Sequence, residues 1–403
     1  MAMLPVADAL EQVLAGVAPL GVEQVALADA QGRVLASDLA AKRTQPPAAV
    51  SAMDGYAVRA ADTATVPVTL TVIGGVAAGH PFDGAVGAGQ AARIFTGGVL
   101  PKGADAIVIQ ENTTRDGDRV TVKSAAVAGR HIRREGIDFR EGDVLLHAGD
   151  RLSDRDLMVA AAMNYPAVPV HRQPRVAILG TGDELVPPGA EPGPGEIVYS
   201  NGFALAALAR TTGALVDQMG VVGDKPADIR DAIRRARGHG ADVLVTTGGA
   251  SVGDHDLVQK ALKDEGLALS FWRIAMRPGR PMLHGRLGPM QVLGLPGNPV
   301  SSYVCATLFL VPLIRRLCGE TRVTPALLSA TLGHDLPMND ERQDYLRAVL
   351  TTNADGTLTA TPVGNQDSSL MASLARADCL VIREPYAQAA RAGSRCVILK
   401  LGL

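Results

Sequence analysis

The chain has 403 residues, enough for roughly two to four domains that each bury a core, so a single small module is excluded. Hydrophobic residues make up 47% and charged residues 20%, the balance of a folded protein rather than of a disordered one. The 39 basic and 41 acidic residues leave a net charge of -2, so no global positive field exists to attract nucleic acid or anionic lipid.

The beginning of the chain and its cysteines predict a compartment. Asp8 and Glu11 fall where a signal peptide needs apolar residues, which favours the cytoplasm. The stretch 287–314 carries no charge, but the turn at 296–299 interrupts it, so we expect a strand, a turn and a buried helix rather than a membrane span. The four cysteines lie far apart and no histidine pair has zinc spacing, which predicts reduced thiols and no zinc site.

The first half of the chain changes its apolar period after one helix. The first 20 residues predict an amphipathic helix that ends at Gly21, because Val6 and Leu10 share one helical face. From about residue 25 to 152 the period is two, which predicts a β-rich region with a hairpin turn at Asp116 and Gly117. Ser153 then predicts the N-cap of a helix that reaches Met163.

The second half alternates between short apolar strands and amphipathic helices. Strands are expected at 176–182, 214–222 and 241–249, a further helix and strand follow, and a helix is expected at 300–317. We expect Asn201 to cap one helix and Pro226 to begin the next. This alternation predicts a mostly parallel sheet with helices on both faces. After Thr321 the period returns to two, which predicts a small β domain.

The expected fold is therefore a multi-domain α/β plus β architecture. A central α/β domain with a mostly parallel sheet joins β-rich N-terminal lobes and a small C-terminal β domain. The expected boundaries are 1–46 with 140–172 for the N-terminal helix and linking domain, 47–139 for the β-rich lobe, 173–322 for the α/β domain, and 323–403 for the C-terminal β domain.

Three loops that follow predicted strands are the expected ligand site. They read GTGDEL at 180–185, TTGGASVGDHD at 246–256 and LPGNPVS at 295–301. Ligands of an open α/β sheet bind outside the carboxyl ends of its strands, where glycines let them approach backbone N–H groups. Neither G-x-G-x-x-G nor G-K-[ST] occurs, so we expect a phosphate-bearing ligand that is bound by another arrangement.

Charged side chains near these loops indicate further chemistry. Arg277 and Arg280 bracket a Pro-Gly turn, so their guanidiniums are expected near one place, where they either bind a tetrahedral oxyanion or remain solvated. The acids of the first two loops are oxygen ligands of the kind that Mg²⁺ takes beside substrate phosphates, although Asp254 could instead cap the next helix. These acids are Asp183, Glu184, Asp254 and Asp256.

Taken together with three segments of the β-rich half, these loops resemble the molybdopterin molybdenumtransferase family, the bacterial MoeA and gephyrin E-domain type. The motifs that carry the resemblance follow one another along the whole chain. They are MDGYA at 53–57, FTG at 95–97, EGIDF at 135–139, GTGDEL at 180–185, TTGGASVGDHD at 246–256, PGRP at 278–281 and LPGNPVS at 295–301.

The resemblance implies a homodimer of elongated four-domain subunits whose α/β domain binds adenylylated molybdopterin. The implied reaction inserts molybdate into the dithiolene of that pterin with Mg²⁺-assisted release of AMP, giving molybdenum-molybdopterin. The implied partners are the molybdopterin adenylyltransferase and the maturation proteins of downstream molybdoenzymes, with no nucleic acid and no membrane.

Matching of motif positions extends the resemblance to individual residues. It implies metal binding by Glu184 and Asp256, and it implies catalytic roles for Asp54, Glu184, Asp256, Arg277 and Arg280. It implies binding of the pterin nucleotide or molybdate by Thr96, Asp138, Gly182, Asp183, Gly248, Gly249, Ser251, Pro296, Gly297, Asn298, Pro299, Ser301, Arg347 and Ser368. Asp54, Thr96 and Asp138 are implied to come from the β-rich lobe of the other subunit.

One departure from the family and two alternative functions remain. The family commonly has lysine before the Pro-Gly turn and often after it, where this chain has Arg277 and Arg280. Arginine keeps the charge but does not readily donate a proton, which weakens the case for an acid at this position. The first alternative is a molybdopterin adenylyltransferase, which the match to the β-rich half disfavours. The second is a dimeric pterin-binding scaffold without catalysis, which the intact charged residues disfavour.

Overall fold

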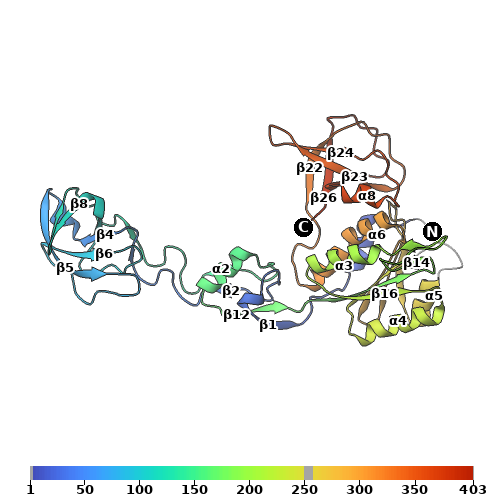
Figure 1. Ribbon diagram of the computed structural model, residues 1–403, viewed down its shortest axis with the longest axis horizontal. Helices are drawn as coiled ribbons and strands as arrows, with labels where there is room; N and C mark the ends of the chain where they lie inside the picture. The colour runs from blue at the N-terminus through green and yellow to red at the C-terminus, as the bar shows by residue number, and fades with distance from the viewer. Residues whose placement is uncertain (1–2, 249–256, 403) are drawn as a thin grey trace.

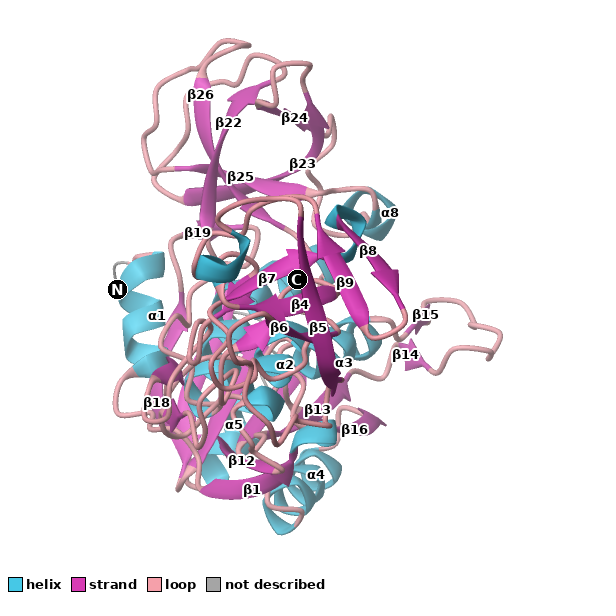
Figure 2. Cartoon of the chain, turned by 90° about the vertical axis from the view of Figure 1, so that its left-hand side faces the viewer, coloured by secondary structure: helices cyan, strands magenta, loops and turns pink. Residues whose placement is uncertain are grey.

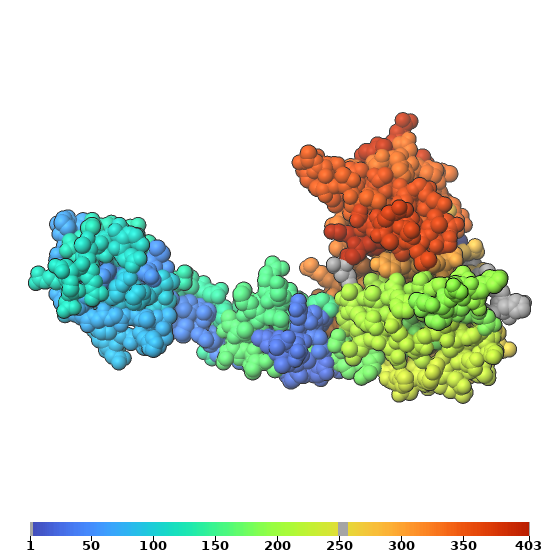
Figure 3. Space-filling model, in the orientation of Figure 1, coloured from blue at the N-terminus to red at the C-terminus, as the bar shows by residue number. Residues whose placement is uncertain are grey.

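The computed structural model describes residues 3–248 and 257–402. The chain is elongated: a β-rich lobe forms one end, a small linking domain lies in the middle, and the α/β and C-terminal domains form the other end (Figure 1). The space-filling view shows how narrow the connection through the linking domain is (Figure 3). Four groups of hydrophobic cores follow this division, and from them we propose the domain boundaries expected above, except that the N-terminal helix belongs with the α/β domain.

The linking domain is built from chain segments on both sides of the lobe. Its elements are β1 (Val22–Ala26), η1 (Leu27–Asp29), β2 (Leu39–Ala40), β11 (Val144–Leu146), α2 (Asp154–Ala162) and β12 (Ala167–His171). Strand β1 pairs with β12 and β2 pairs with β11, both antiparallel. Ser153 is the N-cap of α2 and forms a capping box with Asp156, as the sequence predicted.

The β-rich lobe is a six-stranded sheet of order β7-β4-β6-β5-β9-β8 with a small β3–β10 pair beside it. Its elements are β3 (Val50–Ser51), β4 (Gly55–Val58), η2 (Ala60–Thr63), β5 (Val68–Val76), β6 (Gln90–Ile94), β7 (Ala106–Ile109), η3 (Gln110–Asn112), β8 (Thr113–Asp116), β9 (Arg119–Val122) and β10 (Ile132–Arg133). The predicted hairpin turn is confirmed, because Asp116 pairs with Arg119 across Gly117.

The central sheet of the α/β domain has the order β16-β13-β17-β21-β20-β18. The domain's strands are β13 (Arg175–Thr181), β14 (Leu185–Val186), β15 (Ile197–Val198), β16 (Leu215–Val222), β17 (Val243–Thr247), β18 (Ala268–Arg273), β20 (Pro281–Leu287) and β21 (Met290–Leu295). The first four strands of this order are parallel. Strands β20 and β18 are antiparallel additions at one edge, so the fourth α/β step ends in a hairpin that the sequence did not predict.

Helices cover both faces of this sheet because β13 buries alternate residues on opposite sides. The helices are α3 (Asn201–Thr211), α4 (Pro226–Gly238), α5 (Leu257–Asp264), α6 (Pro299–Cys305), the π-helical segment η4 (Ala306–Leu310) and α7 (Val311–Leu317). Val176 and Ile178 pack toward α3 and α6, whereas Ala177 and Leu179 pack toward α4 and α5. Pro226 begins α4 as predicted.

Two local predictions differ from the structure. The N-terminal helix α1 (Val6–Leu14) is shorter than expected, and it packs on the α/β domain rather than on the linking domain, because Ala9 and Val13 are buried in the same core as α7. Asn201 does not cap α3; the cap position is Ser200, and the Asn201 amide is used elsewhere. The stretch Pro299–Leu317 is long and apolar enough to span a membrane, but it is mostly buried in the protein.

The C-terminal domain is a closed barrel. Its elements are β22 (Leu327–Leu332), β23 (Gln343–Thr352), β24 (Leu358–Pro362), α8 (Met371–Ala375), β25 (Cys379–Arg383) and β26 (Arg395–Lys400). Closure comes from β23, which pairs with both β24 and β25. The two-residue strand β19 (Met276–Arg277) leaves the α/β domain and pairs with β23 in parallel, which joins the two domains (Figure 2).

Candidate functional site

The carboxyl ends of β13, β17 and β21 meet at one edge of the sheet, as the sequence predicted. The strand order reverses at β13, and the crevice at such a reversal is where open α/β sheets bind ligands. A Cβ atom added at Gly248 would lie 2.3 Å from the Thr181 carbonyl oxygen. A Cβ atom added at Gly297 would lie 3.7 Å from Gly248 Cα. Because Gly248 also has φ +90°, only glycine brings these loops this close without strain.

The two acids of the first loop have different surroundings. Asp183 Oδ1 accepts a hydrogen bond of 2.9 Å from Asp224 N, so this carboxylate holds the neighbouring loop. Glu184 is exposed and its carboxylate lies over Gly182, with no ion pair or side-chain hydrogen bond to the described part of the chain. Glu184 is thus the acid of this loop that remains available to a ligand.

The described residues contain no cluster of three metal-ligating side chains, and part of the second loop lies outside them. The predicted residues outside the described part of the chain are Gly249, Ser251, Asp254 and Asp256. Glu184, the free carboxylate among the described residues of these loops, fits an ion that takes most of its ligands from substrate phosphates and water, as Mg²⁺ does.

The third loop is joined to a segment of the C-terminal domain. Asn298 Nδ2 donates to Ser368 Oγ at 2.8 Å, and Val300 N donates to the Ser368 carbonyl at 3.0 Å. Asn201 Nδ2 donates to the Gly297 carbonyl at 2.7 Å, which is the use of this amide that replaces the predicted cap. The site therefore combines both domains. The remaining residues of the loop, Pro296, Pro299 and Ser301, lie at the end of β21 and in α6, and Ser301 is buried.

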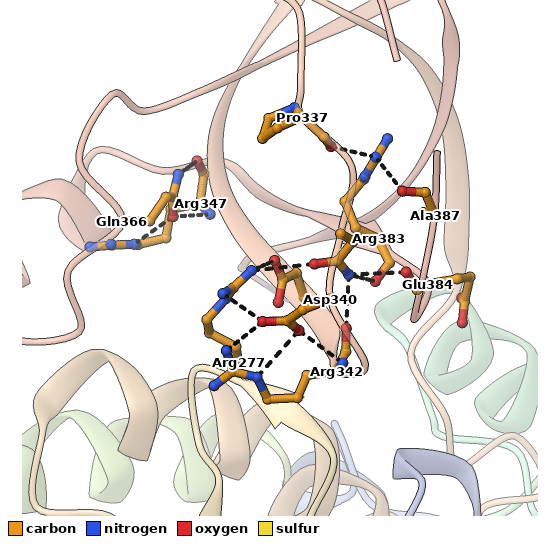
Figure 4. A network of polar contacts seen from close by, with 11 residues as sticks. Arg277, Pro337, Asp340, Arg342, Arg347, Gln366, Arg383, Glu384 and Ala387 are labelled. Carbon is orange, nitrogen blue, oxygen red and sulfur yellow. Dashed lines mark hydrogen bonds and ion pairs between the residues drawn. The ribbon is translucent and has the colours of Figure 1, made fainter. Parts of the chain in front are cut away.

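Arg347 lies beneath the segment that carries Ser368 and is almost completely buried (1% exposed). Its guanidinium has five N–H donors, and all five point to acceptors of the chain. Figure 4 shows Arg347 beside one of them, Gln366. The acceptors are Gln366 Oε1, Ser373 Oγ and the carbonyls of Leu370, Asn365 and Asp367. Burial lowers the pKa of Arg347, and the nearby Asp367 charge opposes this shift. In this arrangement Arg347 holds the segment in place and presents no free donor to a ligand.

The Pro-Gly turn places Arg277 between two domains. Gly279 has φ +114° and a Cβ there would lie 2.4 Å from Cys305 Sγ, so the turn is pressed against α6. Arg277 pairs with Asp344 and Asp340 of the C-terminal domain, whereas Arg280 is exposed and its side chain forms no hydrogen bond or ion pair within the described residues. The expectation that both guanidiniums lie near one place stays a prediction, and the sequence analysis missed the two acids.

A cavity of about 630 Å³ lies beside this turn. Arg277 and Asp344 line one part of it, and residues 364–367, from the segment that carries Ser368, line another. The sequence signal for the two missed acids was weak, because the charged stretch 340–344, which runs into the start of β23, also fits an ordinary solvated turn.

The β-rich lobe presents a second polar group at the opposite end of the molecule (Figure 1). Asp54 Oδ1 accepts hydrogen bonds from Thr96 N at 2.7 Å and Thr96 Oγ1 at 2.8 Å. These bonds lower the pKa of Asp54, so the carboxylate is ionised at neutral pH. Asp138 is also exposed on this lobe. Within one chain the structure does not bring these residues to the loops of the α/β domain.

Comparison with protein-family models gives three matches that together span most of the chain. Residues 4–164 match the MoeA N-terminal region (domain I and II), residues 177–316 match a probable molybdopterin binding domain, and residues 329–401 match the MoeA C-terminal region (domain IV).

Curated relatives and solved structures match the chain nearly from end to end. A molybdopterin molybdenumtransferase of Haemophilus influenzae is 34% identical over 91% of this chain and 90% of its own length. A protein of the same name from Bacillus subtilis is 34% identical over 94% of this chain and 90% of its own length. The crystal structure of a molybdopterin biosynthesis MoeA protein from Pyrococcus horikoshii superposes with a TM-score of 0.85 at 32% identity and covers 100% of both chains.

Proposed function

We propose, from the premise that this chain belongs to the molybdopterin molybdenumtransferase family, that it inserts molybdate into adenylylated molybdopterin and releases AMP. Membership makes it an enzyme of molybdenum cofactor biosynthesis. The finer proposal is supported by one observation. The glycine loops of the α/β domain meet the Ser368 segment and Arg277 at one edge of this domain. This junction supports a site in which the loops take a phosphate and Arg277 takes an oxyanion.

In this proposal, different residues of the chain bind different parts of the substrates. The glycine loops after β13 and β17 take the pterin nucleotide, because their backbone N–H groups can approach phosphate. Arg277, Arg280 and the Ser368 hydroxyl take the molybdate oxyanion, which a guanidinium matches in charge and hydrogen bonding. Glu184 and Asp256 would hold Mg²⁺, which neutralises the charge of the phosphoanhydride when bound.

We further propose that the site is completed by Asp54, Thr96 and Asp138 of a second subunit. The support is the separation of the β-rich lobe from the α/β domain in the elongated chain (Figure 3), together with the available acceptor of Asp54. Thr96 occupies Asp54 Oδ1, so Asp54 Oδ2 remains for a ligand. This proposal includes a homodimer in the cytoplasm that receives its pterin from the adenylyltransferase and hands the product to maturation proteins of molybdoenzymes.

The test follows AMP release and pterin-bound molybdenum after incubation of the purified protein with adenylylated molybdopterin, molybdate and Mg²⁺. Both products are expected together, and Glu184→Gln is expected to reduce both. Binding of the pterin without AMP release contradicts the transferase and leaves the scaffold. Incorporation of AMP into free molybdopterin would instead support the adenylyltransferase.

Mixing two variants tests the second subunit at a molybdate concentration so low that each variant alone has almost no activity. Asp54→Ala and Arg277→Ala impair different parts of a shared site, so random exchange restores about a quarter of the wild-type activity at that concentration, since half of the dimers then carry one intact site. A mixture of Asp54→Ala with Glu184→Gln is expected to behave in the same way, whereas Arg277→Ala mixed with Glu184→Gln, which affect the same half of the site, gives no restoration. No recovery in the first two mixtures, despite subunit exchange, contradicts the shared site.

A further inference from the structure

The guanidinium of Arg277 is held by side chains of the C-terminal domain. Arg277 Nη2 donates to Asp344 Oδ2 and, over 3.3 Å, to Asn339 Oδ1. Arg277 Nη1 donates to Asp340 Oδ2 over 3.2 Å (Figure 4). Asn339 is itself fixed, because its amide donates to the carbonyls of Arg342, Arg383 and Glu384. The cation is therefore placed by a rigid part of the barrel.

Asp344 depends on this cation more than any other acid nearby. It lies opposite Arg277 in the register of β19 and β23, and it is 4% exposed. Asp344 Oδ1 has no hydrogen-bond partner within the described residues, and burial raises the pKa of this carboxyl, against which the Arg277 hydrogen bond and charge act. A buried carboxylate without a cation is costly, so the two charges stabilise each other.

Asp340 differs from Asp344 because it has a second cation. Arg342 Nη2 donates to Asp340 Oδ2 at 2.6 Å, and Arg342 N donates to Asp340 Oδ1 at 2.9 Å. The Arg342 hydrogen bonds are the main reason why the pKa of Asp340 falls to about 2. Asp340 therefore keeps its partner when Arg277 moves, and Asp344 does not.

The contacts of Arg277 leave part of its guanidinium for a ligand. Three of its five N–H donors point to Asp344, Asn339 and Asp340, which leaves the Nε hydrogen and one Nη1 hydrogen without a partner in the described part of the chain. The side chain is 47% exposed and lines the 630 Å³ cavity. A lysine has three donors in all, so it could not make the same three contacts and still offer two donors.

We infer that Asp344 is a positioning residue of the molybdate site: it fixes the guanidinium of Arg277 at the domain junction, where the remaining two donors meet the oxyanion. This inference rests on the proposed function, because it takes molybdate as the ligand of Arg277. Asp344 acts only through Arg277 and contacts no substrate.

A double-mutant cycle with steady-state kinetics tests this role. With the pterin nucleotide saturating, Asp344→Asn is expected to raise the KM for molybdate about tenfold, equivalent to about 1.4 kcal/mol, with the Kd for the pterin nucleotide unchanged. In an Arg277→Ala background the same change is expected to add nothing to the KM, because the group through which Asp344 acts is absent. The matched control is Asp242→Asn, which removes a partly buried Asp–Arg pair at the other end of β17 and leaves the KM unchanged.

The free energy of unfolding tests the same pair of residues without a measurement of turnover. Arg277→Ala leaves Asp344 buried without its cation and is expected to lower stability, and adding Asp344→Asn is expected to recover part of that loss. No recovery overturns the dependence of Asp344 on Arg277, even if the single Asp344→Asn variant fails to fold.

The outcomes separate this inference from the function on which it rests. If the wild type transfers no molybdenum, or if Arg277→Ala leaves the KM for molybdate unchanged, the assigned site fails. If Arg277→Ala raises the KM but Asp344→Asn does not, or if Asp344→Asn raises it equally in both backgrounds, the site stands and the positioning role is refuted.

Discussion

Replacing Arg347 by lysine tests how the Ser368 segment is held. The change keeps the buried charge but reduces the five donors to three on one nitrogen, so at least two of the five acceptors lose their hydrogen bond from this side chain. Each hydrogen bond contributes about 1 kcal/mol net, and each acceptor left unpaired costs about 1–3 kcal/mol. Because residues 365–370 are partly exposed and water can compensate, we expect Arg347→Lys to cost about 2–4 kcal/mol.

Urea unfolding of the C-terminal domain measures this loss, and amide hydrogen exchange locates it. The Val300 N–H donates to the Ser368 carbonyl, so it is expected to exchange faster in the variant. Arg376→Lys is the matched control, because Arg376 is exposed and makes no side-chain contact within the described residues. A loss below about 1 kcal/mol together with unchanged exchange at Val300 would refute the reasoning, since it falls below the cost of one unpaired acceptor.

Two further predictions concern the α/β domain. Gly248→Ala is expected to lower the free energy of unfolding more than the control Gly266→Ala does. The two glycines have similar φ values, +90° and +93°, but only an alanine at 248 places its Cβ against the Thr181 carbonyl. Thermal unfolding should therefore show a loss of about 1–2 kcal/mol for Gly266→Ala and a larger loss for Gly248→Ala. Burial lowers the pKa of His284 from 6.5 to about 4. Between pH 6.5 and 4 the unfolded chain therefore binds more protons than the folded protein. The free energy of unfolding falls as the pH drops through this range, by at most about 3 kcal/mol. His284→Leu is expected to flatten this part of the pH dependence of the melting temperature, and an unchanged slope would contradict it.

Local signals in the sequence predicted those parts of the fold that neighbouring residues determine. Ser153 with Asp156 predicted the start of α2, and Pro226 predicted the start of α4, because capping and fixed φ act within one turn. The glycine loops were also predicted, since the carboxyl ends of parallel strands must share one edge.

Contacts between distant segments could not be predicted in the same way. Asn201 was expected to cap α3, but its amide donates to the Gly297 carbonyl instead. A polar side chain at the start of a helix has two possible partners, and only the tertiary structure determines which one it contacts. The period of α1 predicted a buried face, but the same face could pack on either neighbouring domain. Arg347 carries no local sign that all its donors are used inside the barrel.

The docking of the C-terminal barrel on the α/β domain assembles the oxyanion half of the proposed site. Strand β19 has only two residues, yet its pairing with β23 sets Arg277 opposite Asp344, and the hydrogen bond from Asn298 to Ser368 Oγ holds the other side of the junction. The loop after β13 and Gly248 at the end of β17 follow strands of the parallel sheet and take part in neither contact. Loosening the junction should therefore weaken molybdate binding while the binding of the pterin nucleotide persists, and a variant that loses both together would show that the two halves of the site are not separable.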